Sequence, residues 1–284
     1  MRLITLLAGR YVAGDTLRDE LRAVRRLNLR GMAATCDFLG ENVLKKGRAE
    51  KATRSYIRIL ESLHLHHSDA NISVKLSQLG LDIDESFCKK NLKQILARAE
   101  ELNNFVWIDM ESSAYTDRAI SMYKFFAHNY KKHLGICIQA YLRRSESDIK
   151  GLISLHPNIR LVKGAYKESA QLSFPQKKDV DDNYRHLAKL LLTSGPGLIA
   201  LATHDERIVH DLIGWMKKNK IHASRVEFQM LYGIRKDLQQ KLAKAEYKVR
   251  IYTPFGRQWF PYFYRRLRER KENLFFALKS LFHR

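Results

Sequence analysis

The stretch FVWIDMESSAYTDRAISMYKFFAHNYKKHLGICIQ, residues 105–139, holds two short apolar runs separated by a longer segment of helical pattern. FVWIDM (105–110) and LGICIQ (134–139) are apolar enough to be strands that are buried on both faces. A strand, a helix and a second strand in this order pair the strands in parallel through a right-handed crossover. The stretch therefore predicts one unit of an α/β fold.

The same alternation repeats along the chain. Segments such as FCKKNLKQILARAEELNN (87–104) and IVHDLIGWMKKNK (208–220) have the apolar spacing of amphipathic helices. Eight alternations predict a closed (βα)8 barrel, and an open doubly wound sheet is the alternative. The apolar runs are MAATCDF (32–38), ISVKL (72–76), FVWIDM, LGICIQ, IRLVK (159–163), LIALAT (198–203), RVEFQ (225–229) and KVRIY (248–252).

No composition shift or Gly/Ser-rich linker divides the chain, so we expect a single domain over residues 1–284. Residues 1–30 precede the first apolar run and are expected to form an N-terminal helical extension. Residues 271–284 are expected to form a C-terminal helical tail. The apolar patch in MRLITLLAGRYVAGD (1–15) is short for a secretory signal, so this segment is interpreted as mature protein.

The composition favours a globular protein over one embedded in a membrane. Hydrophobic residues make up 45% of the chain, and the mean hydropathy is -0.38. No apolar run reaches the ~20 residues that a membrane-spanning helix needs. Cys36, Cys88 and Cys137 are sparse and show no CxxC spacing, which predicts a reducing compartment and no disulfide framework.

The charge balance is strongly basic. The chain has 51 Lys and Arg against 30 Asp and Glu, a formal net charge of +21. Such a surface attracts nucleic acid, anionic lipid or an acidic protein. The plain alternative is a basic surface with no specific partner.

Polar residues stand at the ends of the predicted strands. A buried polar group without a partner costs about 1–3 kcal/mol, so seven strands that end this way are not expected by accident. Because the chemistry of a (βα)8 barrel takes place at the C-terminal ends of its strands, these residues predict an active site there. They are Lys75, Asp109, Gln139, Arg160 to Lys163, Thr203 to Asp205, Glu227, Gln229 and Tyr252.

Other motifs carry less information. No GxGxxG or GxxxxGK[ST] motif is present, which argues against a Rossmann or P-loop nucleotide site. The histidines of LHLHH (63–67) lie in a charged helical stretch, so we assign His64, His66 and His67 solvent-facing or structural roles and predict no metal site. Asp109 and Glu111 are two residues apart on a predicted strand and are therefore expected on the same face. A glycosidase could use two such carboxylates. Nearby basic residues would keep both ionised, which suits binding better than proton donation.

Near the C-terminus, YTPFGRQWFPYFYRRLRER (252–270) places Arg265 and Arg266 side by side after a run of aromatic residues. Neighbours on a helix point about 100° apart, so a solvated face does not account for both. Two guanidinium groups that converge from one turn would suit a small carboxylate.

Five segments together resemble the proline dehydrogenase family, flavin-dependent enzymes that begin proline breakdown. They are VKLSQLG (74–80), RLVKGAY (160–166), LATHD (201–205), EFQMLYGIR (227–235) and YTPFGRQWFPYFYRRLRER. DFLGENV (37–43) is similar to the first strand of this family, and the length resembles the short monofunctional bacterial form. The resemblance implies a distorted (βα)8 barrel that holds FAD, with the last helix across its mouth.

The resemblance also implies roles for individual residues. Arg265, Arg266 and Lys75 would bind the proline carboxylate, and Asp109 would orient Tyr252 and one of these arginines. The proline ring would be enclosed by Tyr166, Leu231, Tyr252 and Tyr262. Arg160 would lie near the reactive nitrogen of the flavin and, with Lys75 and Asp109, make up the catalytic set. The residues expected to hold FAD are Gln139, Arg160, Val162, Lys163, Ala165, Thr203, His204, Gln229 and Glu269.

The implied reaction moves a hydride from C5 of L-proline to flavin N5, gives 1-pyrroline-5-carboxylate, and passes electrons to a membrane quinone. Tyr252 would crowd C4 of the ring and favour proline over hydroxyproline. We expect a cytoplasmic protein peripheral to an anionic bacterial inner membrane (or on the matrix face in a mitochondrion), and no nucleic-acid partner. The tail KENLFFALKSLFHR (271–284) would suit membrane contact, or it packs on the barrel. A dehydrogenase for hydroxyproline or another cyclic amine, and a non-catalytic basic binding module, remain alternatives.

Overall fold

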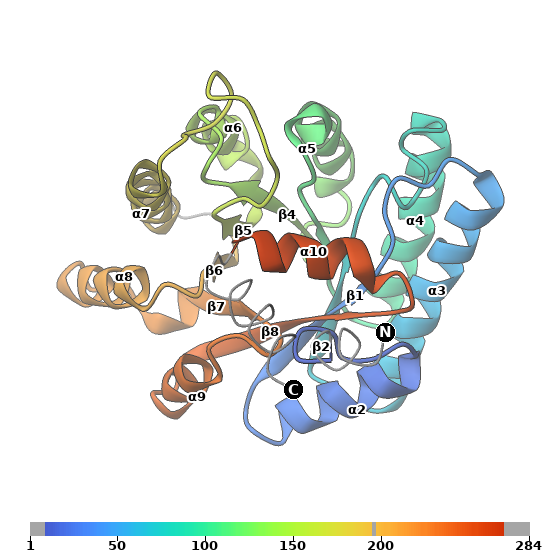
Figure 1. The fold of residues 1–284 in the computed structure, drawn as a ribbon, viewed down its shortest axis with the longest axis horizontal. Helices are drawn as coiled ribbons and strands as arrows, with labels where there is room; N and C mark the ends of the chain where they lie inside the picture. Colours follow the sequence, from blue (N-terminus) through green and yellow to red (C-terminus); the bar gives the residue numbers. More distant parts are fainter. Residues whose placement is uncertain (1–8, 195–196, 270–284) are drawn as a thin grey trace, which may run out of the picture.

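Eight parallel strands form a closed barrel in the computed structural model, which describes residues 9–194 and 197–269 (Figure 1). Each strand pairs with its neighbour in sequence, and β8 pairs with β1 to close the ring. The eight-strand barrel prediction is confirmed and the open sheet is excluded. The strands are β1 (Ala33–Phe38), β2 (Ala70–Val74), β3 (Val106–Ile108), β4 (Leu134–Gln139), β5 (Asn158–Val162), β6 (Ile199–Ala202), β7 (Val226–Leu231) and β8 (Lys248–Phe255).

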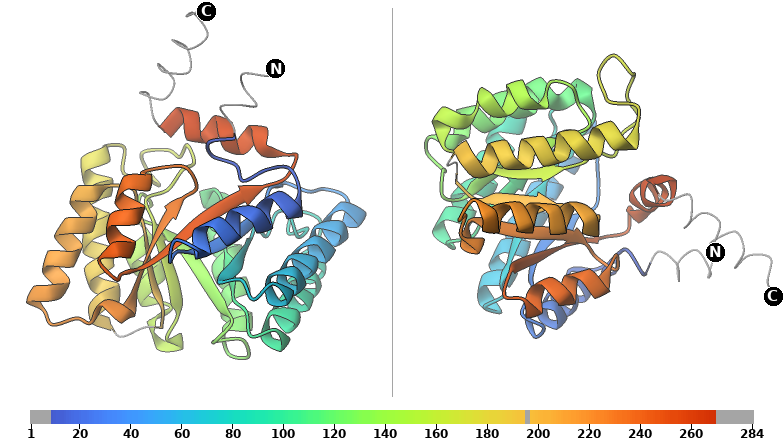
Figure 2. Two further views of the ribbon diagram at one scale, coloured as in Figure 1. Left: turned by 90° about the horizontal axis from the view of Figure 1, so that it is seen from below. Right: turned by 90° about the vertical axis from the view of Figure 1, so that its left-hand side faces the viewer.

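Helices surround the barrel, and the last one crosses its mouth (Figures 1 and 2). Pro261 lies in the first turn of this last helix, where a missing N–H breaks no helical hydrogen bond. Side chains are described as far as Tyr264 on this helix. The helices are α2 (Leu17–Asn28), α3 (Lys46–Leu65), α4 (Glu85–Glu101), α5 (Ser113–Ala127), α6 (Ser145–Lys150), α7 (Lys177–Ser194), α8 (Glu206–Lys218), α9 (Lys236–Lys244) and α10 (Trp259–Glu269).

Helix α4 shows how the sequence builds the outer layer. Asp84 caps its N-terminus by accepting a hydrogen bond from the Phe87 N–H at 2.6 Å. Leu92, Ile95 and Leu96 recur at helical spacing and are fully buried in the main core. Burying each such side chain stabilises the fold by roughly 1.5–3 kcal/mol, so this face fixes α4 on the barrel.

The N-terminal extension contains α2, which packs on β1 and β8. Thr16 and Asp19 form a capping box at its start, and the Asp19 N–H donates to Thr16 Oγ1 at 3.2 Å. The predicted tail 271–284 lies outside the described residues.

The three cysteines lie in the interior, and the LHLHH histidines lie at the surface. All three cysteines are buried and free, and His64, His66 and His67 are exposed at the end of α3. Within the described ranges, no cluster of His, Cys, Asp or Glu could hold a metal. No helix in the same ranges is long and apolar enough to span a bilayer.

Candidate active site

A cavity of about 530 Å³ opens at the C-terminal ends of the strands. Of the residues assigned to the substrate, the cofactor or catalysis, all whose side chains are described line it. Arg265, Arg266 and Glu269 stand on α10, and their side chains lie outside the described part. The predicted residues that line the cavity are Lys75, Asp109, Gln139, Arg160, Val162, Lys163, Ala165, Tyr166, Thr203, His204, Gln229, Leu231, Tyr252 and Tyr262.

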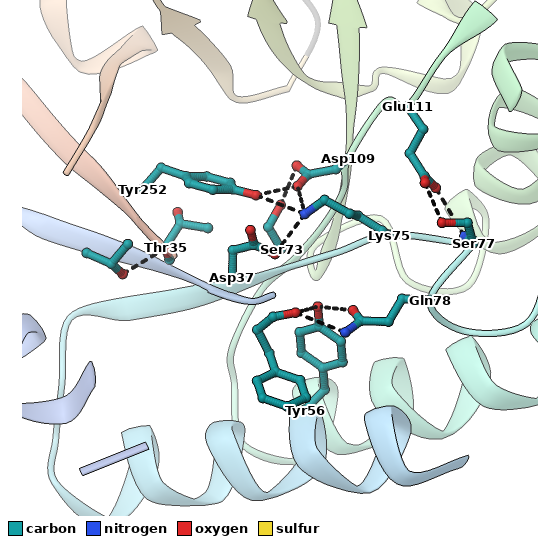
Figure 3. A network of polar contacts seen from close by, with 12 residues as sticks. Thr35, Asp37, Tyr56, Ser73, Lys75, Ser77, Gln78, Asp109, Glu111 and Tyr252 are labelled. Atoms are coloured by element: carbon teal, nitrogen blue, oxygen red, sulfur yellow. Dashed lines mark hydrogen bonds and ion pairs between the residues drawn. The ribbon is translucent and has the colours of Figure 1, made fainter. Parts of the chain in front are cut away.

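Asp109 is the centre of the polar network (Figure 3). It directly follows β3, and its Oδ1 accepts from Ser73 Oγ at 2.5 Å and from Arg160 Nη1 at 2.8 Å. Its Oδ2 accepts from the Tyr252 hydroxyl at 2.6 Å and from Lys75 Nζ at 3.5 Å. Burial pushes the pKa of Asp109 upward, but Lys75 and Arg160 outweigh it and hold the pKa below its ordinary value. Asp109 is therefore a permanent anion at the floor of the cavity.

Lys75 is held between two carboxylates. It is 6% exposed, and its Nζ donates to Asp37 Oδ1 at 2.8 Å in addition to its contact with Asp109. Burial lowers the pKa of Lys75, but the two carboxylates outweigh burial and raise it well above its ordinary value. Lys75 is thus a fixed cation.

Asp37 on β1 was not predicted as a site residue. It is fully buried, and burial raises its pKa against the opposing charge of Lys75. The available signal was a single charged residue inside the apolar run MAATCDF.

Arg160 projects into the barrel from β5 and is 2% exposed. Its guanidinium carbon lies 4.6 Å from the Trp107 ring centre and 5.5 Å from that of Tyr252. Its Nη1 also donates to Ser73 Oγ at 3.0 Å. Among the described residues, Nε and Nη2 of Arg160 and Oε1 of Gln139 are buried without a hydrogen-bond partner. Polar atoms left this way beside a cavity are suited to a polar ligand.

Four charged residues form a ring at the rim. Lys163 at the end of β5 pairs with Asp181 and, at 3.1 Å, with Asp205. Lys177 pairs with the same two carboxylates, at 3.3 Å to Asp205. Burial raises the pKa of Asp205, but both lysines outweigh it and lower the pKa to about 2. Lys177 and Asp181 were missed because they begin α7, where charged residues resemble an ordinary solvated helix start.

The RLVKGAY and LATHD segments owe their positions to local backbone features. Gly164 has a φ of +116°, and a Cβ there would lie 2.1 Å from the Tyr141 ring, so a glycine is required. This turn brings Ala165 and Tyr166 to the cavity. The Nε2 of His204 accepts a hydrogen bond from the Leu231 N–H at 2.8 Å, which fixes the ring and leaves the proton on Nδ1.

Two expectations about acidic residues are wrong. β3 ends at Ile108, and Glu111 turns away from Asp109 to accept a hydrogen bond from the Ser77 N–H at 3.0 Å (Figure 3). Burial raises the pKa of Glu111, and this effect exceeds the opposing effects of the Ser77 hydrogen bonds and of Lys75. Glu227 lies outside the cavity lining and pairs with Arg250 at 2.8 Å.

The cavity also has an apolar lining that no sequence motif indicated. Cys137, Ala202 and Met230 belong to strands β4, β6 and β7, and Met110 and Ile234 follow strand ends. In a barrel whose strands are apolar throughout, the sequence does not distinguish cavity-facing apolar residues from core ones. The site therefore combines a charged floor with apolar walls.

Comparisons with known proteins agree on one family. The family model described as proline dehydrogenase matches residues 20–278. The chain is 42% identical to proline dehydrogenase 1 of Bacillus subtilis subsp. natto over 274 residues, which cover 96% of this chain and 90% of that protein. It is 38% identical to proline dehydrogenase of Deinococcus radiodurans over 279 residues, which cover 97% of this chain and 90% of the relative.

A solved structure supports the same conclusion. It is proline utilization A from Bdellovibrio bacteriovorus inactivated by N-propargylglycine, with a TM-score of 0.87 and 26% identity. The match covers 95% of this chain and 33% of that longer one. The chain is an oxidoreductase that belongs to the proline dehydrogenase family.

Proposed function

We propose that this enzyme oxidises L-proline to 1-pyrroline-5-carboxylate with FAD as cofactor and a membrane quinone as electron acceptor. The observation that carries this proposal is that one cavity beneath α10 combines buried charged residues at its floor with aromatic residues along its wall. A small amino acid with an apolar ring needs both. Proline-dependent reduction of a redox dye by the purified holoenzyme tests the proposal, and a rate no higher than without proline would contradict it.

The donor set fits FAD. Arg160 offers two buried N–H donors and Gln139 one buried acceptor that have no partner among the described residues, matching the mixed polar edge of a flavin ring. Lys163 at the rim, which pairs with Asp181 and Asp205 in this structure, is the cation that would be available to a cofactor phosphate. When bound, FAD would supply the hydride acceptor for the oxidation of proline. The residues that would hold it are Gln139, Arg160, Val162, Lys163, Ala165, Thr203, His204, Gln229 and Glu269.

The protein's own part in the reaction is positioning and electrostatics. Arg160 keeps a buried positive charge beside the flavin site, which favours the electron-rich form of the ring. Tyr166, Leu231, Tyr252 and Tyr262 enclose the substrate ring and exclude water from it. Holding the ring in one orientation converts hydride transfer into an effectively unimolecular step.

Charge balance explains why a further cation is needed at the site. In the described cluster, Lys75 and Arg160 are matched by Asp37 and Asp109. A substrate carboxylate placed there would be a surplus buried anion. Arg265 and Arg266 on α10 would supply the missing positive charge and the bidentate geometry.

Replacing Arg265 or Arg266 with methionine is expected to raise the proline KM at least tenfold, equivalent to about 1.4 kcal/mol of binding. The methionine keeps the apolar stem and removes the charge that pairs with the carboxylate. Steady-state kinetics measure the change, with Arg257→Met as the control because Arg257 is exposed and precedes α10. A wild-type KM in either α10 variant would refute the carboxylate assignment.

Replacing Tyr252 with serine is expected to slow proline turnover and to improve tolerance of hydroxyproline. Serine opens the space that the phenol ring occupies and loses the 2.6 Å bond to Asp109. The ratio of kcat/KM for the two substrates measures the effect, and Tyr252→Phe separates the bond from the ring volume. Unchanged proline turnover in Tyr252→Ser would show that Tyr252 does not border the substrate.

The proposal places the enzyme in the cytoplasm, peripheral to an anionic membrane, where it would reach its quinone. The net charge of +21 supports such contact, since basic residues near anionic lipid contribute about 1 kcal/mol each. Co-sedimentation with vesicles of phosphatidylglycerol and phosphatidylcholine tests it. Binding that ignores the anionic fraction and the salt concentration would contradict it.

A further inference from the structure

Glu20 is a buried carboxyl group on the outside of the barrel, away from the cavity. It lies on α2 with Ala23, Val24 and Leu27, whose spacing defines the face that packs on β1 and β8. Glu20 is fully buried and forms no ion pair with any described residue. An ionised carboxylate in such a position would be costly, because burial of an unpaired charge is strongly disfavoured.

The hydrogen bonds around Glu20 indicate its protonation state. Thr253 Oγ1 contacts Glu20 Oε1 and also lies 3.0 Å from the main-chain oxygen of Thr35. The Thr253 hydroxyl has one proton, so it can donate to only one of these two oxygens. The main-chain carbonyl oxygen of Thr35 carries no proton and can only accept. Both contacts are hydrogen bonds only when Glu20 carries a proton, donates it to Thr253, and Thr253 donates to Thr35.

The remaining surroundings agree with a neutral acid. Glu20 Oε2 is buried and has no hydrogen-bond partner among the described residues. Cys36 on β1 and Thr253 on β8 face Glu20, Asp37 acts on it electrostatically from the interior side of β1, and no cation is among these groups. Burial raises the pKa of Glu20 from 4.5 to about 8 and the charge of Asp37 adds to this, against the stabilisation that the Thr253 hydroxyl and the Cys36 thiol would give an ionised carboxylate.

These contacts lead directly to the active site. Successive residues of a strand face opposite sides, so Thr253 and Cys36 face α2 while Tyr252 and Asp37 face the barrel interior. Cys36 and Thr253 are register partners where β1 and β8 pair. Tyr252 donates to Asp109, and Asp37 accepts from Lys75. The strand pair that α2 covers thus carries Asp37 and Tyr252, two members of the polar network at the cavity floor.

We propose that Glu20 is a positioning residue for the proline reaction, held as a neutral acid whose hydrogen bond to Thr253 fixes the β1–β8 pair and with it Tyr252 and Asp37. The effect of Glu20 on catalysis rests on the proposed function, whereas the protonation of Glu20 does not. Loss of the proton removes a donor and places a negative charge between α2 and the barrel. The strand pair then loses its outer support.

The proton is tested first by the pH dependence of unfolding. Glu20 loses its proton near pH 4.5 in the unfolded chain and near pH 8 in the folded chain. The stabilisation that the bound proton gives the folded state is therefore complete below pH 4.5 and is lost as the pH rises to 8. Between pH 5 and 7, the folding equilibrium constant of wild type should fall about a hundredfold relative to Glu20→Gln, since one linked proton changes it about tenfold per unit. Glu100→Gln, which removes an exposed carboxylate on α4, should follow wild type.

Denaturant unfolding of the full-length holoenzyme at several pH values measures this difference. A wild-type protein and a Glu20→Gln variant with parallel pH dependences would overturn the protonation. The test needs no enzyme activity, so it remains informative if proline is not the substrate.

The positioning role is tested by proline kinetics at pH 7. Glu20→Gln keeps a neutral donor and should retain kcat/KM within about twofold, whereas Glu20→Ala should raise KM and lower kcat/KM at least tenfold. Equal activity of the Gln and Ala variants would overturn the role. Should Glu20→Ala fail to fold, Thr253→Val removes the hydroxyl that links Glu20 to Thr35. This variant should show the same loss of kcat/KM. A wild-type kcat/KM in Thr253→Val would contradict the positioning role.

Discussion

Replacing Asp109 with alanine is expected to lower kcat/KM for proline at least about a thousandfold and to destabilise the protein by about 3–5 kcal/mol. Asp109 receives hydrogen bonds from Ser73, Arg160, Lys75 and Tyr252. Without it, Arg160 loses its only described carboxylate partner and remains buried as an uncompensated cation. Tyr252 also loses its acceptor, so both charge balance and substrate fit are disturbed.

Two comparisons separate these effects. Asp109→Asn keeps the shape and one acceptor but removes the charge, so it should be better folded than the alanine variant and still poorly active. Asp117→Ala breaks a pair with Arg144 in which the carboxylate side chain is 78% exposed, and should cost less than about 1 kcal/mol. Steady-state kinetics and denaturant unfolding measure all three. An Asp109→Ala enzyme that resembles Asp117→Ala would contradict the central role of Asp109.

Replacing Arg160 with methionine is expected to lower kcat/KM at least about a hundredfold and to reduce the flavin bound per protein, because the site loses a preorganised charge and its donors. Nε and Nη2 of Arg160 are the donors proposed to face FAD, and methionine retains only the apolar stem. The absorbance ratio of flavin to protein after purification measures occupancy, and dye-coupled turnover measures catalysis.

Arg160→Lys tests whether charge alone is sufficient. A lysine keeps the positive charge but lacks the planar donor set, so we expect activity between wild type and Arg160→Met. Arg185→Met, on the outer helix α7 where Arg185 pairs with Asp211, is the matched control. Full flavin content together with wild-type turnover in Arg160→Met would exclude Arg160 from the cofactor site.

The barrel was predictable because its strands are short, apolar and regularly spaced. LIALAT and LGICIQ are buried on both sides by helices and by the barrel interior, so their sequences are nearly continuous apolar runs. Polar residues at the ends of such runs do not fit in an apolar core. This is why Lys75, Gln139 and Thr203 could be assigned to the cavity from sequence.

Contacts between distant segments were not predictable. Glu20 and Thr253 are 233 residues apart, and nothing local in LRDELRAV marks one acidic residue of α2 as buried. Glu111 was misplaced because β3 ends at Ile108, so the alternation that would align it with Asp109 had already stopped. Strand ends depend on how the chain leaves the barrel, which short patterns do not specify.

The most direct test of the proposed function is a visible spectrum of the purified protein, recorded without oxygen before and after addition of L-proline. We predict a flavin absorption band that bleaches when proline is added, which shows cofactor, substrate and transfer of reducing equivalents in one sample. A flavin band that proline leaves unchanged would contradict proline as the donor. A protein without flavin absorbance that also fails to bind added FAD would contradict the proposed cofactor and the chemistry that depends on it.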